Sequence, residues 1–375
     1  MSDVVGLLQA LIRCPSVTPT DAGVMAIVEN ELLRLGFSCE RMIFGAGKDE
    51  TQNLYAKKGT GEPHFCFLGH VDVVPVDGQN WDYPPFGAEI HNGRIYGRGA
   101  MDMKSGIACF IKALENFTFN GTISLLITGN EEDIPTYGTP AVLKELTGRG
   151  EKWTAAIVGE PGGTEATGSV IKTGRRGSLN ARLTVTGKSG HTGYTQLAVN
   201  PVEALCDILN ELRRPLDDGT PDFEPSTLSV TTIDVDNPTP NVIPAAAFAK
   251  FNCRFNDLHT AESLTKLLRG RIESAAKKAG VSYDFKTECM ADVFICKDRR
   301  LPELVRQAIK ETTGIEPAES TAGGSSDARF MVKHCPVLEC GISGQNMHGA
   351  NESVTVADLE VQIQIYRRIL EKFFG

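Results

Sequence analysis

The sequence predicts an α/β protein in which a mostly parallel sheet flanked by helices is interrupted by an inserted second domain. Three observations support this. Gly and Pro residues divide most of the chain into short apolar runs that alternate with helical patterns. After Gly177 the pattern changes to strands of alternating polarity, and after residue 290 the first pattern resumes.

The first part of the chain supplies most elements of the predicted parallel sheet. Its opening segment, MSDVVGLLQALIRCP, has the apolar spacing of an amphipathic helix. The run HFCFLGHVDVV lies between Pro63 and Pro75, which is typical of a buried strand. The predicted strands are 64–74, 122–128 and 155–159. The predicted helices are 22–36, 100–116 and 139–146.

The inserted part follows the order β-α-β-β-α-β, which is the ferredoxin-like plan. Its predicted strands are 178–187, 227–235, 245–255 and 282–289, and its predicted helices are 200–214 and 261–280. The last part adds a strand at 336–342 and helices at 299–313 and 356–374. We therefore predict one discontinuous domain, 1–176 with 290–375, and one inserted domain, 177–289.

Composition narrows the classes of partner. The 375 residues carry 38 Lys and Arg against 47 Asp and Glu, a net charge of −9, which disfavours binding to nucleic acid. No apolar run approaches the roughly 18 residues of a membrane span. No basic region precedes the first apolar stretch, so we expect no secretory signal peptide. The ten cysteines lack C-x-x-C spacing, which favours free thiols in the cytoplasm over zinc–thiolate sites.

Acidic and imidazole side chains gather where predicted strands end, and in two glycine-containing segments. They are His70 and Asp72 in LGHVDVVP, Asp102 in GRGAMDMKSG, Glu131 and Glu132 in LLITGNEED, Glu160 in AIVGEPGG, and His348 in QNMHGANE. Each alone is more often a structural or solvated residue. In open α/β sheets, however, sites lie beyond the carboxyl ends of the strands. Together these residues predict a metal site.

The kinds of ligand indicate which metal and which chemistry to expect. Imidazole and carboxylate without thiolate suit Zn²⁺, with Co²⁺ or Mn²⁺ as alternatives. Two histidines and three carboxylates exceed what one catalytic zinc with an open position needs, and they suit two ions bridged by a carboxylate. Two such cations lower the pKa of a shared water, and a nearby unligated carboxylate takes its proton. The expected reaction is metal-assisted hydrolysis of an amide or ester.

The ordered set HVD, GRGAMDMKSG, NEE, VGEP and MHGANE resembles the M20 family of dinuclear zinc amidohydrolases. The resemblance covers nearly the whole chain. It implies a zinc-exopeptidase-like catalytic domain, an inserted lid and dimerisation domain, and a homodimer. It also implies that Asp102 bridges two Zn²⁺ (with Co²⁺ as an alternative in one or both sites), that His70 and Glu160 hold one ion, and that Glu132 and His348 hold the other.

The same resemblance implies roles for residues outside the ligand set. Asp72 would orient the imidazole of His70, and Glu131 would be the general base and acid. His191, in SGHTGY of the inserted domain, would reach across the dimer to stabilise the oxyanion of the tetrahedral intermediate. A surface-loop histidine is the alternative for His191.

Five further positions are candidate substrate contacts. The guanidinium groups of Arg175 and Arg254 are bidentate donors suited to a substrate with several carboxylates. Tyr194, Asn241 in NVIP and Ser325 in GGSSD stand at positions that resemble substrate contacts in the family.

The motifs KTGRRGS, SGHTGYTQLAVNP, NVIP and GGSSDARF resemble one branch of the family. That branch hydrolyses N-succinyl-LL-2,6-diaminopimelate to succinate and LL-2,6-diaminopimelate in lysine and diaminopimelate biosynthesis. Another N-acyl amino acid deacylase, such as an acetylornithine deacetylase, is the alternative. A non-catalytic binding protein would have lost ligands, and all five are present. A dinucleotide site is disfavoured because GRGAMD lacks the third Gly of G-x-G-x-x-G.

Overall fold

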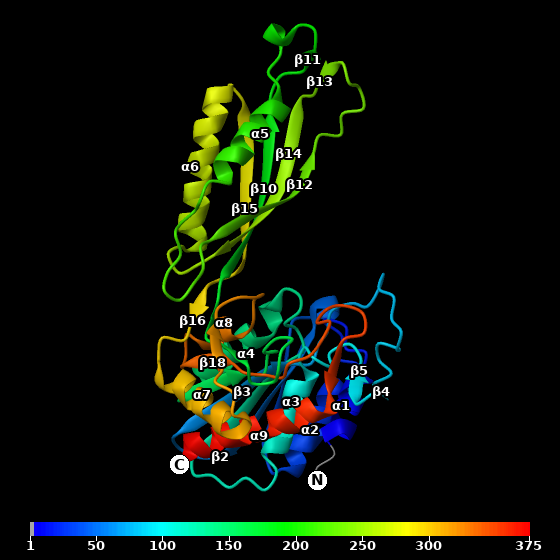
Figure 1. The fold of residues 1–375 in the computed structure, drawn as a ribbon, viewed down its shortest axis with the longest axis vertical. Helices are drawn as coiled ribbons and strands as arrows, with labels where there is room; N and C mark the ends of the chain where they lie inside the picture. The colour runs from blue at the N-terminus through cyan, green and yellow to red at the C-terminus, as the bar shows by residue number, and fades with distance from the viewer. Residues whose placement is uncertain (1–3) are drawn as a thin grey trace. The chain divides into compact units, whose positions relative to one another are not determined.

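The computed structural model describes residues 4–375, which form two compact units. The first unit contains the chain up to Gly174 together with Ile295–Ser320 and Ser326–Gly375. The second unit contains Arg175–Phe294 and Thr321–Ser325. Figure 1 labels their elements. The chain passes between the units four times: within the short strands β9 (Gly174–Arg175) and β16 (Phe294–Ile295), and at the two ends of Thr321–Ser325.

An eight-stranded sheet forms the centre of the first unit, in the order β1-β2-β6-β3-β7-β18-β8-β17. The strands are β1 (Ser38–Phe44), β2 (Thr51–Gly59), β3 (His64–His70), β6 (Thr122–Thr128), β7 (Ala155–Val158), β8 (Val170–Lys172), β17 (Ala318–Ser320) and β18 (Val337–Glu339). The four central strands, β6, β3, β7 and β18, run parallel, whereas β1 and β2 are antiparallel at one edge. The sequence did not predict β1 and β2, because neither strand is a continuous apolar run and the residues of β1 are mostly half-buried or exposed.

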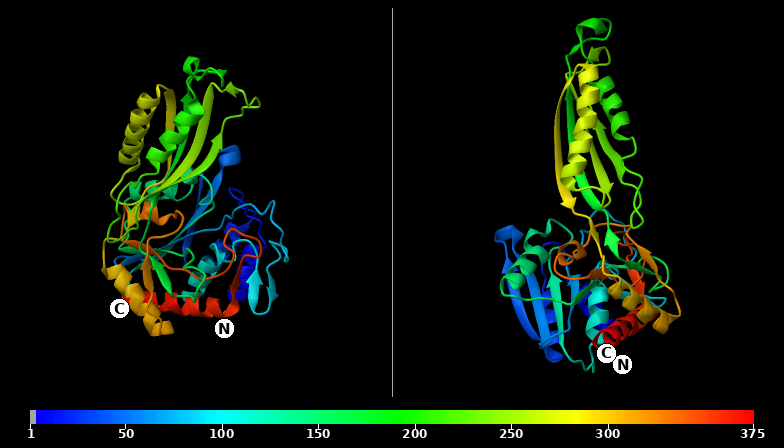
Figure 2. Two further views of the ribbon diagram at one scale, coloured as in Figure 1. Left: turned by 45° about the horizontal axis from the view of Figure 1, so that its top comes forward. Right: turned by 90° about the vertical axis from the view of Figure 1, so that its left-hand side faces the viewer.

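Helices cover both faces of this sheet, as the fold class requires. Alternate residues of β3 and β6, such as Phe65 and Ile123, share one core with five helices. These are α1 (Val4–Ile12), α2 (Val24–Arg34), α3 (Lys104–Ala113), α7 (Arg300–Thr313) and α9 (Val356–Phe374). The short α8 (Ala328–Met331) contacts α4 (Thr139–Gly148), and neither helix contributes to that core, so these two helices lie on the other face of the sheet. Figure 2 shows the ribbon from two further sides.

Two features bring distant segments to the end of the central strands. A Cβ on Gly106 of α3 would lie 2.5 Å from the carbonyl oxygen of Gly159, so glycine allows α3 to approach the end of β7. A small antiparallel sheet, β19-β5-β4, adds a second constraint. Its strands are β4 (Glu89–His91), β5 (Arg94–Tyr96) and β19 (Ser353–Thr355). Pairing of β5 with β19 places the segment before α3 beside the loop before α9.

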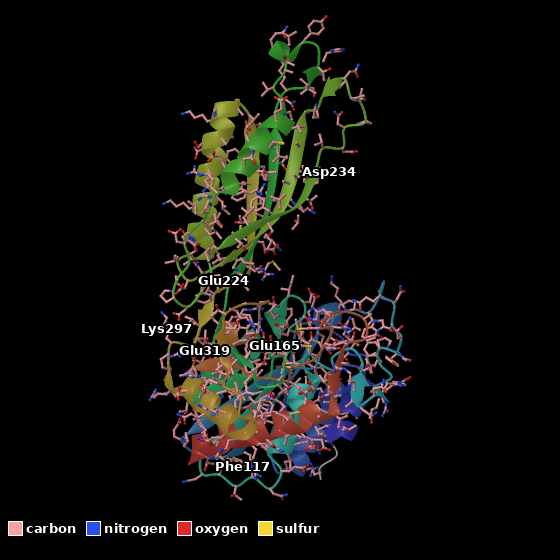
Figure 3. All side chains as sticks on the ribbon, viewed as in Figure 1. Phe117, Glu165, Glu224, Asp234, Lys297 and Glu319 are labelled. Atoms are coloured by element: carbon pink, nitrogen blue, oxygen red, sulfur yellow. The ribbon has the colours of Figure 1, made fainter. Side chains whose placement is uncertain are left out.

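The second unit is a four-stranded antiparallel sheet in the order β12-β14-β10-β15, with two helices packed on it. Its elements are β10 (Gly177–Thr186), β11 (Gly190–His191), α5 (Pro201–Leu212), β12 (Thr227–Asp234), β13 (Val242–Ile243), β14 (Ala246–Phe255), α6 (Ala261–Ala279) and β15 (Ser282–Ala291). The strand order and the β-α-β-β-α-β sequence are those of the ferredoxin-like plan. β12 ends at Asp234, which Figure 3 labels among the side chains.

Local signals explain the longest helix of the second unit. Thr260 and Ser263 form a capping box at the start of α6, and Gly280 ends the helix with φ 69°.

All ten cysteines of the chain are free thiols. Among residues 4–375, none of the helices has the length and apolar character needed to cross a membrane.

Candidate active site

Three neighbouring parallel strands end at one place in the first unit. His70 is the last residue of β3, Glu131 and Glu132 follow β6, and Glu160 follows β7. Because β3 lies between β6 and β7, these side chains meet beyond the carboxyl edge of the sheet. Asp102 joins them from the segment before α3.

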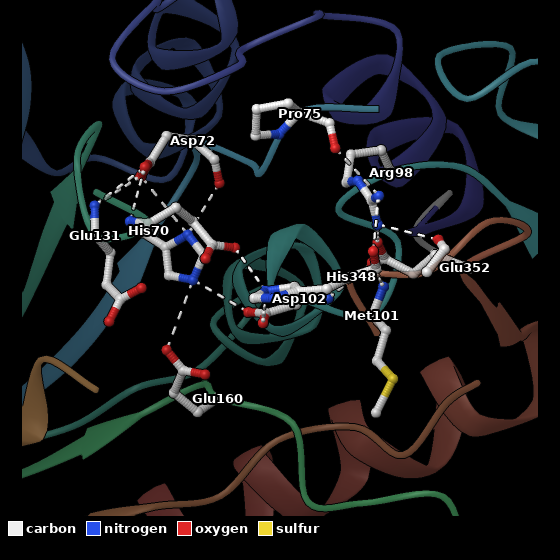
Figure 4. A network of polar contacts seen from close by, with 12 residues as sticks. His70, Asp72, Pro75, Arg98, Met101, Asp102, Glu131, Glu160, His348 and Glu352 are labelled. Carbon is white, nitrogen blue, oxygen red and sulfur yellow. Dashed lines mark hydrogen bonds and ion pairs between the residues drawn. The ribbon is translucent and has the colours of Figure 1, made fainter. Parts of the chain in front are cut away.

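Asp102 lies between the two imidazoles and offers one oxygen to each (Figure 4). Its Oδ1 is 3.1 Å from Nε2 of His70, and its Oδ2 is 3.3 Å from Nε2 of His348. The same nitrogen of His70 is 3.6 Å from Oε1 of Glu160, and that of His348 is 3.1 Å from Oε1 of Glu132. The structure therefore brings all five predicted ligands together, in two groups that share Asp102.

Glu131 lies in the same cluster. One ligand atom each from His70, Asp102 and Glu132 lie within 4.8 Å of one another, and so do atoms of His70, Glu131 and Glu160. The second group means that the position of Glu131 alone is compatible with a ligand or with a base. Its role as general base stays a prediction.

The charges and the burial of the cluster strongly shift the pKa values of its side chains. Burial alone would lower the pKa of His70, but hydrogen bonds with Asp102 and Glu160 raise it well above its ordinary value. Hydrogen bonds to Asp102 and Glu132 raise the pKa of His348 to about 10. Burial raises the pKa of Glu160 to about 7, with help from the charge of Asp102.

The two other carboxylates shift in opposite directions. Burial would raise the pKa of Asp102, but hydrogen bonds from His348 and His70 hold it well below its usual range. Burial raises the pKa of Glu131 well above its ordinary value, and the neighbouring charge of Glu160 adds to this while His70 opposes it. Perturbation on this scale is common at functional sites.

Asp72 is fully buried and makes two kinds of contact. Its backbone carbonyl is 3.0 Å from Nδ1 of His70, whereas its carboxylate Oδ1 is 3.6 Å from that nitrogen. The carboxylate accepts the backbone N–H groups of Glu131 and Glu132 at 3.1 Å. Asp72 thus also fixes the turn that carries both glutamates, a contact that the sequence did not suggest.

The donor set fits two divalent cations. Carboxylates outnumber imidazoles in the cluster. Because His70, Asp102 and Glu160 are buried, this negative charge is concentrated where solvent has little access. Such charge requires a compensating cation or protonation. Oxygen and imidazole donors without thiolate are the ligands of catalytic Zn²⁺ and related ions.

The remaining predicted residues lie in the second unit, in two groups. His191, Tyr194 and Asn241 lie near the β11–β13 pair, where the carbonyl of Asn241 accepts the N–H of Thr192 at 3.1 Å. His191, Tyr194 and Asn241 are exposed.

The second group lies at the opposite end of β10 and β14. Arg175 precedes β10, and Arg254 pairs with Ser178 across the sheet. A Cβ on Gly323 would lie 2.1 Å from Nη1 of Arg175, so the segment that carries Ser325 passes close to this guanidinium. Burial lowers the pKa of Arg254, and the neighbouring charge of Arg176 adds to this. Excess positive charge here suits a carboxylate ligand.

Comparison with known proteins agrees with this geometry. The model of peptidase family M20/M25/M40 matches residues 66–372. The chain belongs to this family. It is 47% identical to the succinyl-diaminopimelate desuccinylase of Parvibaculum lavamentivorans, over 100% of this chain and 96% of that protein. It is 48% identical to the enzyme of the same name from Rhodospirillum centenum, over 100% and 98%.

Solved structures share the fold. The aminopeptidase PepT of Bacillus cereus superposes with a TM-score of 0.80 at 19% identity, covering 99% of this chain and 98% of the other. The YXEP protein of Bacillus subtilis, described as a dinuclear metal binding peptidase of the M20 family, gives 0.73 at 15% identity, covering 98% and 96%. The family membership agrees with the resemblance inferred from the motifs, and the fold class is confirmed.

Proposed function

We propose that this chain hydrolyses N-succinyl-LL-2,6-diaminopimelate to succinate and LL-2,6-diaminopimelate, a step of lysine and diaminopimelate biosynthesis. The observation that carries the proposal is the complete imidazole–carboxylate cluster around Asp102, in a chain that matches desuccinylases along its whole length. A binding protein on this fold would have no need for such a cluster.

In this proposal His70 and Glu160 hold one divalent ion, Glu132 and His348 hold the other, and Asp102 serves both. Zn²⁺ is the proposed ion, with Co²⁺ as an alternative. Bound cations of this kind activate water and polarise a carbonyl group. Asp72 keeps Glu131 and Glu132 in place through their backbone N–H groups.

The carboxylate of Glu131 is the proposed proton carrier. It takes a proton from the attacking water, whose oxygen bonds to the succinyl carbonyl carbon. It then gives the proton to the amide nitrogen as the C–N bond breaks, which yields a free carboxylate and a free amine. The half-buried environment that raises the pKa of Glu131 suits a group that holds a proton between these two steps.

The second unit supplies the proposed substrate contacts. Arg175 and Arg254 would bind substrate carboxylates, and Tyr194, Asn241 and Ser325 would complete the pocket. His191 would stabilise the oxyanion from the partner subunit of a homodimer formed through the second unit. The chain is proposed to act in the cytoplasm, in keeping with its ten free cysteines.

The experiment that tests this function measures succinate release from N-succinyl-LL-2,6-diaminopimelate, with N-acetylornithine alongside. Metal-loaded and chelated enzyme are compared. We expect metal-dependent turnover of the succinyl substrate alone. Activity on acetylornithine only would keep the metal centre and replace the substrate, whereas activity that survives chelation would contradict the metal centre.

A further inference from the structure

A fully buried ion pair, Arg98 with Glu352, links the backbones of two proposed metal ligands in the first unit (Figure 4). Nη1 of Arg98 donates to Oε2 of Glu352 at 2.8 Å. The other carboxylate oxygen accepts the backbone N–H groups of Met101 and Asp102 at 2.8 and 3.1 Å. Glu352 therefore holds the segment that aims Asp102.

Arg98 reaches the second ligand from the other side. Its Nη2 donates to the carbonyl of His348 at 3.1 Å, and its Nη1 donates to that of Gly349 at 3.2 Å. Gln79 supports the same point, because its amide nitrogen donates to the carbonyl of His348 at 2.9 Å and its amide oxygen accepts from Arg98 at 2.8 Å. A continuous path of hydrogen bonds thus joins Asp102 to His348.

The loop needs such support. His348 has φ 60°, a left-handed conformation that residues with a Cβ rarely adopt and that surroundings must hold in place. Its side chain is 45% exposed, so packing of the ring alone does not fix it. The carbonyl contacts from Arg98 and Gln79 fix the backbone instead.

A gain in folding stability does not explain why the chain buries the ion pair of Arg98 and Glu352. Both side chains are at most 1% exposed, and the cost of removing two charges from water offsets much of their attraction. A buried guanidinium is useful where its fixed fork must contact several acceptors at once. Here those acceptors belong to the two segments that carry Asp102 and His348.

We propose that Arg98 and Glu352 are positioning residues that set the distance between Asp102 and His348, and thereby the affinity of the ion that these two would share with Glu132. The inference rests on the proposed metal centre but concerns binding of the ion rather than turnover. Outer contacts of metal ligands typically affect affinity by about 10- to 100-fold.

The test titrates metal-free protein with Co²⁺ and follows visible absorption and heat. The variants are Glu352→Gln, which keeps an acceptor but loses the charge, and Arg98→Lys, which keeps the charge but loses the fork. His348→Ala identifies which binding step belongs to the His348 ion. We expect that step to weaken by about 10- to 100-fold in both variants, with an altered absorption spectrum, because it involves both Asp102 and His348; the other step, which involves Asp102 alone of the two, should weaken less.

Two controls separate positioning from general damage. Ile123→Ala removes core contacts at the start of β6, away from the cluster, and should lower the melting temperature without changing either binding step. Gln79→Ala keeps the ion pair but removes one of the contacts to the carbonyl of His348 and the acceptor of Arg98, and we expect it to weaken the same step by about tenfold; an unchanged step would overturn the positioning role. If Glu352→Gln and Arg98→Lys fail to fold, Gln79→Ala decides.

The outcomes are distinct. Unchanged Co²⁺ binding in the folded variants would overturn the positioning role, and so would weakening that also appears in Ile123→Ala. A wild-type chain that binds fewer than two ions would overturn the proposed metal centre and this inference with it.

Discussion

The core of the cluster in the first unit and the group near β11 and β13 in the second unit differ in exposure. In the first unit, His70, Asp102 and Glu160 are buried and contact one another directly. In the second unit, the side chains of His191 and Tyr194 are exposed, that of Tyr194 by 58%. The difference teaches that the fold of the first unit alone assembles the imidazole–carboxylate cluster, whereas the exposed groups of the second unit contact no part of that cluster within their own unit and, in the proposed function, would act only once substrate or another subunit contacts them.

The largest loss of activity should come from substitution of Glu131, the proposed general base in the first unit. We expect Glu131→Gln to lower kcat by about 10²- to 10⁴-fold, because a positioned general base contributes on this scale. Both ions should remain bound, since the amide keeps the size of the side chain. Steady-state kinetics with metal analysis of the same sample checks both points.

Glu131→Asp is the matched control, because it keeps the carboxylate but shortens its reach. It should recover part of the lost rate. Loss of an ion from Glu131→Gln would instead assign Glu131 to the ligand set, which its closeness to His70 and Glu160 permits.

A substitution in the second unit should lower kcat by a somewhat smaller factor, and mixing of subunits should restore activity. We expect His191→Ala to lower kcat by about 10²- to 10³-fold, the usual cost of one oxyanion donor. Subunits with His191→Ala mixed and refolded with Glu131→Gln subunits should regain activity, because one site of each mixed dimer would be intact. Activity assays across mixing ratios provide the measurement.

Two results would weaken the comparison between the units. An unchanged rate in His191→Ala would remove the residue from the reaction. Loss of rate without repair on mixing would place His191 in the site of its own chain, or would indicate that no dimer forms.

Metal removal should affect one unit more than the other. Both tryptophans, Trp81 and Trp153, lie in the first unit, so their fluorescence reports its unfolding, whereas labelling of the buried Cys253 reports the second. Ions at a hundredfold excess over Kd stabilise a fold by about 2.7 kcal/mol. We therefore expect chelation to lower the free energy of unfolding followed by tryptophan fluorescence in urea by this order, with a smaller change in Cys253 labelling followed by mass spectrometry.

Glu160→Gln offers a matched comparison, because it weakens metal binding and relieves negative charge in the cluster. Chelation should shift its midpoint less than that of the wild type. Equal shifts of both probes in the wild type would show that the units unfold as one, and the stabilisation would not be confined to the first.

The sequence predicted most of the regular elements and the residues of the cluster, for identifiable reasons. Buried parallel strands such as β6 are continuous apolar runs, and the candidate residues Glu131 and Glu132 come shortly after its end. The ferredoxin-like order was visible because its strands alternate in polarity. Strands β1 and β2 were not predicted because neither forms a continuous apolar run, and only β1 lies at the edge of the sheet.

Contacts between distant segments could not be predicted from the motifs. Arg98 and Glu352 were visible as letters in GRGAMD and MHGANE, but nothing in either motif shows that they pair. The same holds for the carboxylate of Asp72 and the turn after β6. Spacing along the chain indicates chemistry, whereas pairing across the fold requires coordinates.

The smallest expected effect concerns the core of the second unit rather than any site. Burial raises the pKa of the Cys253 thiol from 9.0 to about 12. Between these values the unfolded chain loses this proton and the folded chain keeps it, so the free energy of unfolding falls as the pH rises. The contribution lost by pH 10 is about 1.4 kcal/mol, which corresponds to one pKa unit.

The substitution Cys253→Ala removes packing contacts at every pH. The difference in free energy of unfolding between the wild type and Cys253→Ala should therefore shrink by this amount between pH 8 and pH 10 in urea titrations. A constant difference between Cys253→Ala and the wild type across this pH range would contradict the shift.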